Sequence, residues 1–297
     1  MLPHPVSVLE VVLVCFLILA FFPEHTWKQA TTTSRTRSVH GLALPKLNKM
    51  TLSDVLVAGM RGTTGSKHGL ARLAKLNETE ASSIIYRALD TAHGFARTKM
   101  GSGKGGGKVN GAWIEGYSNP TEGGSLRAMV RGLSGVDNRT LQVCEIGFNG
   151  GHSAANYLVM NLFGLRVRYL GFDLGEHPYA HTARRFLLSL FGDRIDVVWG
   201  DSERTLRDYH AANPHFVCDV AMVDGLHTYA AALADTLNFL PLTRSGSIVA
   251  IDDMTHPQLG QAWRDAHTAC PQSLRRQGCM GNHWCRSQRT TGVKLKA

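Results

Sequence analysis

Charged residues are scarce in this 297-residue chain: they make up 19% of it, against 43% hydrophobic residues. A chain with so little charge and so much apolar content is not mainly disordered. The content of 31 glycines and ten prolines excludes a collagen-like protein, and six cysteines are too few for a disulfide-dense scaffold. The length suits one domain with additional segments, or two domains at most. The composition is therefore that of a globular protein with a sizeable core.

Acidic residues are absent from two stretches, and this absence accounts for much of the formal net charge of +9. Residues 25–53 and 275–297 contain Lys and Arg but no Asp or Glu. Residues 111–274, in contrast, carry 12 Lys and Arg against 17 Asp and Glu. A groove that binds nucleic acid concentrates its positive charge within the folded domain. We therefore expect no nucleic-acid partner.

The longest apolar run lies near the N-terminus, where residues 11–22 are all apolar. A membrane-spanning helix needs about 20 such residues, whereas the core of a signal peptide needs about 7–15. Because no small-residue cleavage site follows, we favour an uncleaved signal anchor over residues 1–24, with a cleaved signal peptide or a buried helix as alternatives. The expected localisation is a single-pass membrane protein of the endomembrane or Golgi type; the alternative is a secreted or organelle-targeted protein.

Two further segments precede the main domain. Residues 25–53 are basic and rich in Ser and Thr, which is typical of a solvated stalk and also of an organelle transit segment. Residues 54–110 form a helical extension with a glycine-rich linker, and a helix is expected at 78–95 as a lid, a homodimer contact or ordinary packing. The linker contains GKGGGK, but it lacks the P-loop pattern and no strand precedes it.

The cysteines favour no metal site. Cys144 and Cys218 fall in predicted buried strands, where cysteine usually packs as a small hydrophobe. Cys270, Cys279 and Cys285 cluster near the C-terminus, without the closely spaced pair that is typical of a zinc site. Free thiols remain open there, as does a disulfide if the domain is luminal.

From residue 141 onward, short apolar runs alternate with helical stretches. Strands are expected at 141–146, 168–172, 195–199, 218–223 and 247–251, with helices at 153–163, 179–191, 203–210 and 228–240. This alternation predicts an α/β fold with a doubly wound, mostly parallel sheet, buried on both faces, within a domain of residues 111–297. After residue 257 we expect one more helix and a hairpin ending near residues 292–295.

Acidic residues stand at successive strand ends, where parallel sheets bind their ligands. The first strand ends in EIGFNGGHS, whose glycines allow a tight turn and a close ligand, although the spacing is not that of a dinucleotide site. Glu145 there can accept hydrogen bonds from a cationic or hydroxyl-bearing ligand. Asp173 can hold both hydroxyls of a ribose, and Asp201 can reach an adenine amino group. Each acid alone can be a helix cap, but three together favour a ligand site.

The ordered set resembles the class I S-adenosylmethionine-dependent methyltransferases over residues 117–253. EIGFNGGHSA is similar to their glycine-rich motif I, Asp173 to the acid of motif II, and the GDS sequence at 200–202 to the adenine-side motif. The resemblance implies a Rossmann-like fold and a loop near residues 122–125 that faces the methionine end of the cofactor. It also implies a cofactor site made of Glu145, Gly147, Asn149, Gly151, Ser153, Asp173, Asp201 and Ser202.

The next two strand ends are also acidic. They read VDGLHTY and IDDM, so Asp224, Asp252 and Asp253 should converge. Three carboxylates in one cleft repel each other unless a cation holds them, and all-oxygen ligation suits Mg²⁺, Mn²⁺ or Ca²⁺. The alternative for Asp252 and Asp253 is a helix cap and a polar loop.

This second pattern is similar to the cation-dependent O-methyltransferases of catechols, caffeoyl thioesters and macrolide sugars. The resemblance implies Asp224, Asp252 and Asp253 as metal ligands and His227 as the general base. The alternative for His227 is a packing residue that caps a helix. Asp235, further along the same helix, is expected to make structural contacts.

We therefore predict a membrane-anchored methyltransferase that uses S-adenosylmethionine and a divalent cation. Its acceptor is expected to be a hydroxyl of a sugar or glycan, or else of a phenol or another small molecule. The alternatives are another enzyme on the same type of sheet, such as an aminopropyltransferase or an oxidoreductase, and a non-catalytic membrane-tethered module.

Overall fold

The computed structural model describes residues 69–93, 108–109, 112–113, 120–133, 139–271, 274–280 and 284–289. The predicted anchor, the stalk and the glycine-rich part of the linker lie outside these residues. No helix within the described residues is long and apolar enough to cross a membrane.

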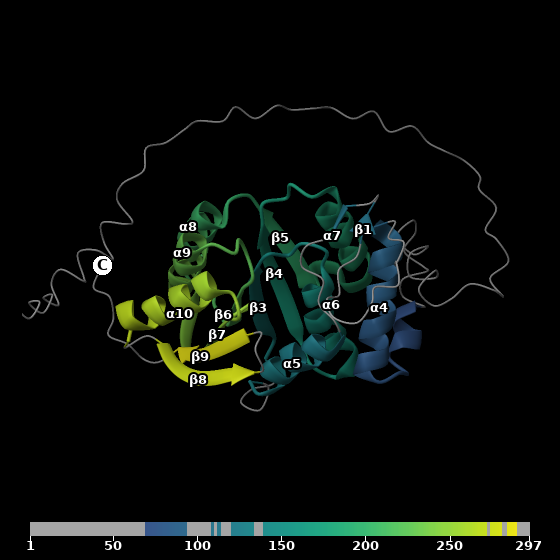
Figure 1. The fold of residues 1–297 in the computed structure, drawn as a ribbon. Helices are drawn as coiled ribbons and strands as arrows, with labels where there is room; N and C mark the ends of the chain where they lie inside the picture. The colour runs from purple at the N-terminus through teal and green to yellow at the C-terminus, as the bar shows by residue number, and fades with distance from the viewer. Residues whose placement is uncertain are drawn as a thin grey trace, which may run out of the picture. The chain divides into compact units, whose positions relative to one another are not determined.

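Seven strands of the described chain form one sheet in the order β5-β4-β3-β6-β7-β9-β8 (Figure 1). The strands are β3 (Leu141–Ile146), β4 (Val167–Asp173), β5 (Ile195–Trp199), β6 (Cys218–Val223), β7 (Thr243–Ile251), β8 (Leu274–Met280) and β9 (Trp284–Arg289). Strands β3 to β7 pair in parallel, whereas β9 pairs antiparallel with both β7 and β8. The predicted parallel α/β sheet is confirmed, and the expected C-terminal hairpin is β8–β9. A separate short pair joins β1 (Lys108–Val109) to β2 (Ala112–Trp113).

Helices cover both faces of the sheet. They are α4 (Glu78–His93), α5 (Pro120–Arg131), α6 (His152–Val159), α7 (Pro178–Phe191), α8 (Ser202–Ala212), α9 (Tyr229–Phe239) and α10 (Pro257–Ala269), with 3₁₀ turns at Met160–Phe163, Gly192–Arg194 and Leu240–Leu242. Figure 1 shows α8, α9 and α10 on one side of the strands and α6 and α7 on the other, with α4 beyond them. The residues at 122–125, expected in a loop, belong to α5, so that expectation is wrong.

Local sequence signals explain where several of these helices begin. Pro178 and Pro257 occupy the first position of α7 and α10, where a missing N–H leaves no helical hydrogen bond unmade. Thr228 caps α9, because its hydroxyl accepts a hydrogen bond from the N–H of Ala231.

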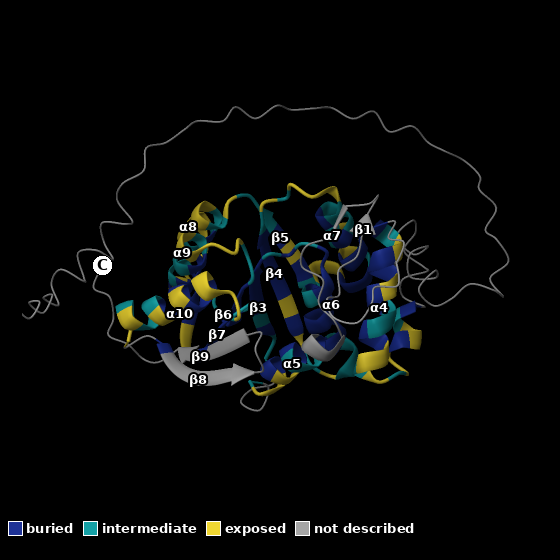
Figure 2. Cartoon of the chain, in the orientation of Figure 1, coloured by how far each residue is buried: buried dark blue, intermediate teal, exposed yellow. Residues whose placement is uncertain are grey.

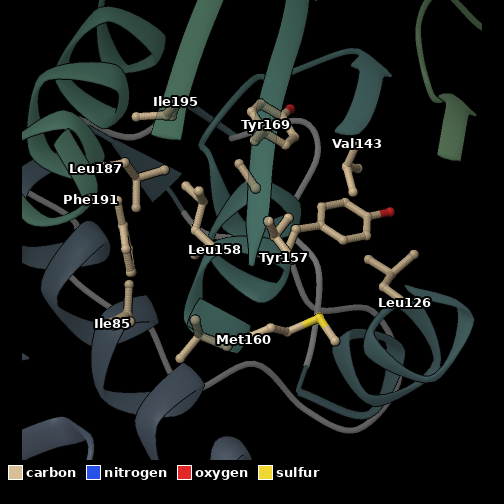
Figure 3. Packing of buried hydrophobic residues seen from close by; sticks show 14 of the residues in the cluster. Ile85, Leu126, Val143, Tyr157, Leu158, Met160, Tyr169, Leu187, Phe191 and Ile195 are labelled. Carbon is tan, nitrogen blue, oxygen red and sulfur yellow. The ribbon is translucent and has the colours of Figure 1, made fainter. Parts of the chain in front are cut away.

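The apolar core lies in two layers, one on each face of the sheet (Figure 2). Alternate strand residues serve the two layers, so that Val143 and Tyr169 face α6 and α7, whereas Ile146 and Phe172 face α8 to α10. Figure 3 shows the first layer, in which Ile85 of α4 points toward Phe191 of α7. Burying a side chain of this size contributes about 2 kcal/mol, so α4 is held by the same core as the sheet.

A disulfide joins Cys144 of β3 to Cys218 of β6, with a Cα–Cα distance of 5.8 Å. Both cysteines are completely buried, next to an irregularity in the strand register between Cys218 and Val220. Burial was predicted correctly, but the interpretation of these residues as separate small hydrophobes is wrong, because β3 and β6 are neighbours in the sheet.

Ion pairs around a buried aspartate tie the strands together at the edge opposite to their carboxyl ends. The carboxylate of Asp219 lies 2.6 Å from Arg139 and 3.4 Å from Arg244, and it accepts a hydrogen bond from the N–H of Gln142. Asp219 is nearly inaccessible to solvent. Its partners hold the starts of β3, β6 and β7 in register, so this cluster is structural.

Candidate active site

The glycine-rich turn between β3 and α6 has an unusual backbone. Gly147, Asn149 and Gly151 have φ angles of 92°, 49° and 76°. A Cβ on Gly147 would stand 1.9 Å from the carbonyl oxygen of Asp224, so only glycine fits there. The turn after β3 and the turn after β6 are therefore in direct contact.

Asp173, at the end of β4, lies beside this turn. One of its carboxylate oxygens accepts a hydrogen bond from the N–H of Asn149 at 2.9 Å, and the other accepts one from the N–H of Gly175 at 2.7 Å. Each oxygen keeps a second lone pair, and the side chain is only half-buried. Asp173 is thus fixed in place with the capacity to hold two hydroxyl groups.

Glu145 lies beneath the turn and is almost completely buried. Its carboxylate accepts hydrogen bonds from the hydroxyl of Ser153, at 2.6 Å, and from that of Tyr169. Burial raises the pKa of Glu145 to about 7, although these two hydrogen bonds act in the opposite direction. Glu145 and Ser153, two of the predicted cofactor residues, are therefore in direct contact, and the hydroxyl of Ser153 orients the carboxylate of Glu145.

Replacing Glu145 with glutamine should change how stability depends on pH. Between its ordinary pKa near 4.5 and its folded value of about 7, the folded state binds more protons than the unfolded state. Rising pH therefore destabilises the wild type, and from pH 5 to pH 8 it should lose roughly 2 to 3 kcal/mol of unfolding free energy relative to Glu145→Gln. Urea unfolding of both proteins at the two pH values measures this difference. An identical pH dependence in the two proteins would contradict the assignment.

The adenine-side residues follow β5. Asp201 is the N-cap of α8, and its carboxylate accepts a hydrogen bond from the N–H of Glu203 at 2.9 Å. The helix-cap alternative is therefore realised, while the exposed carboxyl group still stands at a strand end. The hydroxyl of Ser202 donates to the buried carboxyl of Asp235 at 2.7 Å, and burial raises the pKa of Asp235 to about 7.

Several aromatic residues that no sequence motif indicated lie around this edge. The ring of His181 lies 4.3 Å from that of Trp199, the last residue of β5. The hydroxyl of Tyr179 donates to the side chain of Asn149 at 2.8 Å. Their positions depend on how α7 packs, which no local sequence pattern specifies.

A second cluster forms where β6 and β7 end. Atom Nε2 of His227 lies 3.3 Å from a carboxylate oxygen of Asp253 and 4.0 Å from one of Asp224. One potential ligand atom from each of these three residues falls within 4.8 Å of the other two. Asp253 has a φ of 50°, a conformation that non-glycine residues rarely adopt and that is enriched at functional sites.

Asp252 is placed differently from the other predicted ligands. Its carboxylate accepts a hydrogen bond from the N–H of Asp253 at 2.7 Å, and among the described residues it is not one of the three clustered side chains. It lines a small pocket together with Asp224, His227 and the apolar side chains of Ile251 and Leu259. The structure thus places His227, the predicted base, with Asp224 and Asp253, and leaves Asp252 beside them.

Comparison with known proteins identifies the domain. Residues 144–254 match the model of a family described as a methyltransferase domain. No curated protein matches the sequence of the chain. The match supports the predicted methyltransferase class for these residues, which make up a little over a third of the chain.

One of the similar solved structures has a TM-score above 0.5 and shows the same fold. A protein from Listeria monocytogenes assigned to the class I S-adenosylmethionine-dependent methyltransferases is 10% identical, with a TM-score of 0.52, over 82% of this chain and 88% of that chain. At that identity the likeness shows the fold alone. The TDP-rhamnose 3'-O-methyltransferase of calicheamicin biosynthesis is 25% identical, with a TM-score of 0.45, over 58% of this chain and 80% of that chain. An O-methyltransferase from Bacillus cereus is 19% identical, with a TM-score of 0.46, over 58% of this chain and 83% of that chain.

Proposed function

We propose that the protein methylates a hydroxyl oxygen with the help of a divalent cation. The observation that carries this proposal is the convergence of Asp224, His227 and Asp253 next to the strand ends that would hold the cofactor. The two carboxylates at this spacing fit the oxygen-donor chemistry of Mg²⁺ or Mn²⁺, and the imidazole of His227 lies beside them as a proton acceptor. A cation bound there would lower the pKa of an acceptor hydroxyl and orient it.

The cofactor residues fit S-adenosylmethionine, which supplies the methyl group. Asp173 offers two carboxylate oxygens to the ribose hydroxyls, and Gly147 leaves the room that a side chain would fill. Asp201 and Ser202 would hold the adenine side of the cofactor, and Glu145 with Ser153 its methionine side. S-adenosylmethionine held there would supply the methyl group to the acceptor oxygen, and these residues would contribute to the rate by positioning it.

His227 is the proposed base. It is exposed and takes the proton of the acceptor hydroxyl at Nε2, the atom that faces Asp224 and Asp253. Neutral imidazole is the proton acceptor best suited to pH 7. Asp224 and Asp253 would hold the cation beside this imidazole.

The proposed acceptor is a sugar, glycan or phenol. Leu226, which is 66% exposed, lines the same pocket as Asp224 and His227 and gives the site an apolar rim. A ring that carries a hydroxyl group suits such a rim of apolar and polar groups. The membrane anchor and the endomembrane localisation stay predictions from the sequence.

Substitutions of these residues should separate metal binding from proton transfer. We expect Asp224→Asn and Asp253→Asn to weaken Mn²⁺ binding at least tenfold, and Asp252→Asn to weaken it less. His227→Ala should keep Mn²⁺ affinity within about threefold and lower kcat at least a hundredfold, as expected for the loss of a general base. Calorimetry with Mn²⁺ and transfer of a labelled methyl group to a panel of sugars, glycans and catechols measure the two effects.

The wild type in EDTA is the control for the metal, and it should transfer no label. If His227→Ala lost Mn²⁺ affinity as strongly as Asp253→Asn, His227 would be a ligand and the proposed base would be wrong. Full activity in EDTA would contradict the role of the cation.

A further inference from the structure

We propose that helix α4 helps to set the affinity for S-adenosylmethionine. Its residues Asp90 and His93 hold the glycine-rich turn between β3 and α6 in one conformation, so they act as positioning residues. This inference rests on the proposed cofactor site. Helix α4 precedes the residues that match the methyltransferase domain model, which begin at residue 144. It lies beside α6 and α7 in Figure 1.

The first brace is a hydrogen bond from His93 to the turn itself. Atom Nε2 of His93 lies 3.2 Å from the carbonyl oxygen of Gly150. A carbonyl only accepts, so the imidazole donates. Burial lowers the pKa of His93 to about 4, so the ring is neutral at pH 7 and its N–H is the one that points at Gly150.

The second brace holds the other end of the same turn. Atom Nε2 of His152, the first residue of α6, donates to the carboxylate of Asp90 at 3.1 Å. The ring of Tyr86 packs edge-on against that of His152, with 5.0 Å between centroids. Both residues that flank Gly151 are therefore held by side chains of α4, and all of these side chains are buried.

A chain of contacts continues from His93 to the ribose-binding acid. The ring of His93 lies 6.0 Å from that of Tyr179, whose hydroxyl donates to the side chain of Asn149 at 2.8 Å. The N–H of Asn149 in turn donates to Asp173 at 2.9 Å. His93 of α4 is therefore connected by three successive contacts to Asp173, the residue that would hold the ribose.

The backbone of the turn explains why such bracing matters. Gly147 and Gly151 allow many conformations, and Asn149 is held in the left-handed region. Without the braces the turn would sample other shapes, and a ligand would have to order it on binding, which weakens affinity. We expect loss of the His93 hydrogen bond to raise the Kd for S-adenosylhomocysteine, the product that S-adenosylmethionine leaves after methyl transfer, at least tenfold.

The test is calorimetric titration of the full chain with S-adenosylhomocysteine. His93→Phe keeps a ring against Tyr179 but removes the donor, and it should raise the Kd at least tenfold. His93→Gln keeps an N–H donor and should restore much of the affinity. Thr91→Ala, on the exposed side of the same helix, should leave the Kd within twofold.

Asp219→Asn separates a purely structural role of His93, because it weakens the ion pairs of the buried Asp219 at the opposite edge of the sheet. That variant should lower the urea midpoint and leave the Kd unchanged. An unchanged Kd in His93→Phe overturns the inference, as does an equal rise in Asp219→Asn. Absence of binding to the wild type would instead overturn the cofactor site. If His93→Phe does not fold, Asp90→Ala removes the other contact of α4 with the turn and should raise the Kd as well.

Discussion

Replacing Asp173 with alanine should weaken binding of S-adenosylmethionine and S-adenosylhomocysteine at least a hundredfold. The two carboxylate oxygens would each accept a hydrogen bond from a ribose hydroxyl, and hydrogen bonds to a charged group contribute about 1.5–3 kcal/mol each. The change also leaves the N–H groups of Asn149 and Gly175 without the acceptor that now holds them. Both effects act on binding, so calorimetric titration with S-adenosylhomocysteine measures them directly.

Asp193→Ala is the matched control for this change. Asp193 also carries a carboxylate, but its side chain is 90% exposed and pairs with Arg168 far from any strand end that would hold the cofactor. Surface pairs of this kind contribute little to stability. The control should bind like the wild type. If Asp173→Ala also bound like the wild type, the assignment of Asp173 to the ribose hydroxyls would be wrong.

Replacing Gly147 with alanine should disrupt both halves of the active site at once. The new Cβ would stand 1.9 Å from the carbonyl oxygen of Asp224, so either the cofactor turn or the turn that carries Asp224 must move. The φ of 92° adds backbone strain. We expect the unfolding free energy to fall by about 3 kcal/mol or more, together with loss of cofactor and Mn²⁺ binding.

Gly164→Ala separates strain from collision. Gly164 has a φ of 87°, close to that of Gly147, but a Cβ there would meet nothing within 4 Å. This variant should lose only the roughly 1–2 kcal/mol of the left-handed conformation and keep full binding. Urea unfolding and titration of both variants test the comparison. Equal losses in the two would mean that the contact between Gly147 and Asp224 does not matter.

The sequence predicted the sheet well because its signal is local. The apolar runs at 141–146, 195–199 and 218–223 coincide with β3, β5 and β6 residue for residue. The order of the strands is not a local property. For that reason the pairing of Cys144 with Cys218 could not be read from two separate runs.

The candidate site stays a prediction from the strand ends, and the structure adds which of its side chains meet. Strand ends identify Asp173 and Asp224, but side-chain direction decides which neighbours meet. The left-handed backbone at Asp253 turns its carboxylate toward His227, while the carboxylate of Asp252 accepts from the N–H of Asp253. His93 and Asp90 lie more than fifty residues before the turn that they contact, a separation that no motif spans.

The link between β3 and β6 also bears on where and how the enzyme is made. Both sulfur-bearing residues are sealed inside the sheet, so the bond has to form while the chain is still closing around them. In the cytosol, glutathione and thioredoxin keep such pairs as thiols, whereas the secretory lumen oxidises them. A disulfide that joins residues 74 positions apart lowers the entropy of the unfolded chain, which stabilises the folded protein by about 4 kcal/mol. The dithiol form does not have this stabilisation. Protein prepared in a reducing host and protein prepared in an oxidising host would therefore differ covalently, and the oxidised form would have the higher free energy of unfolding.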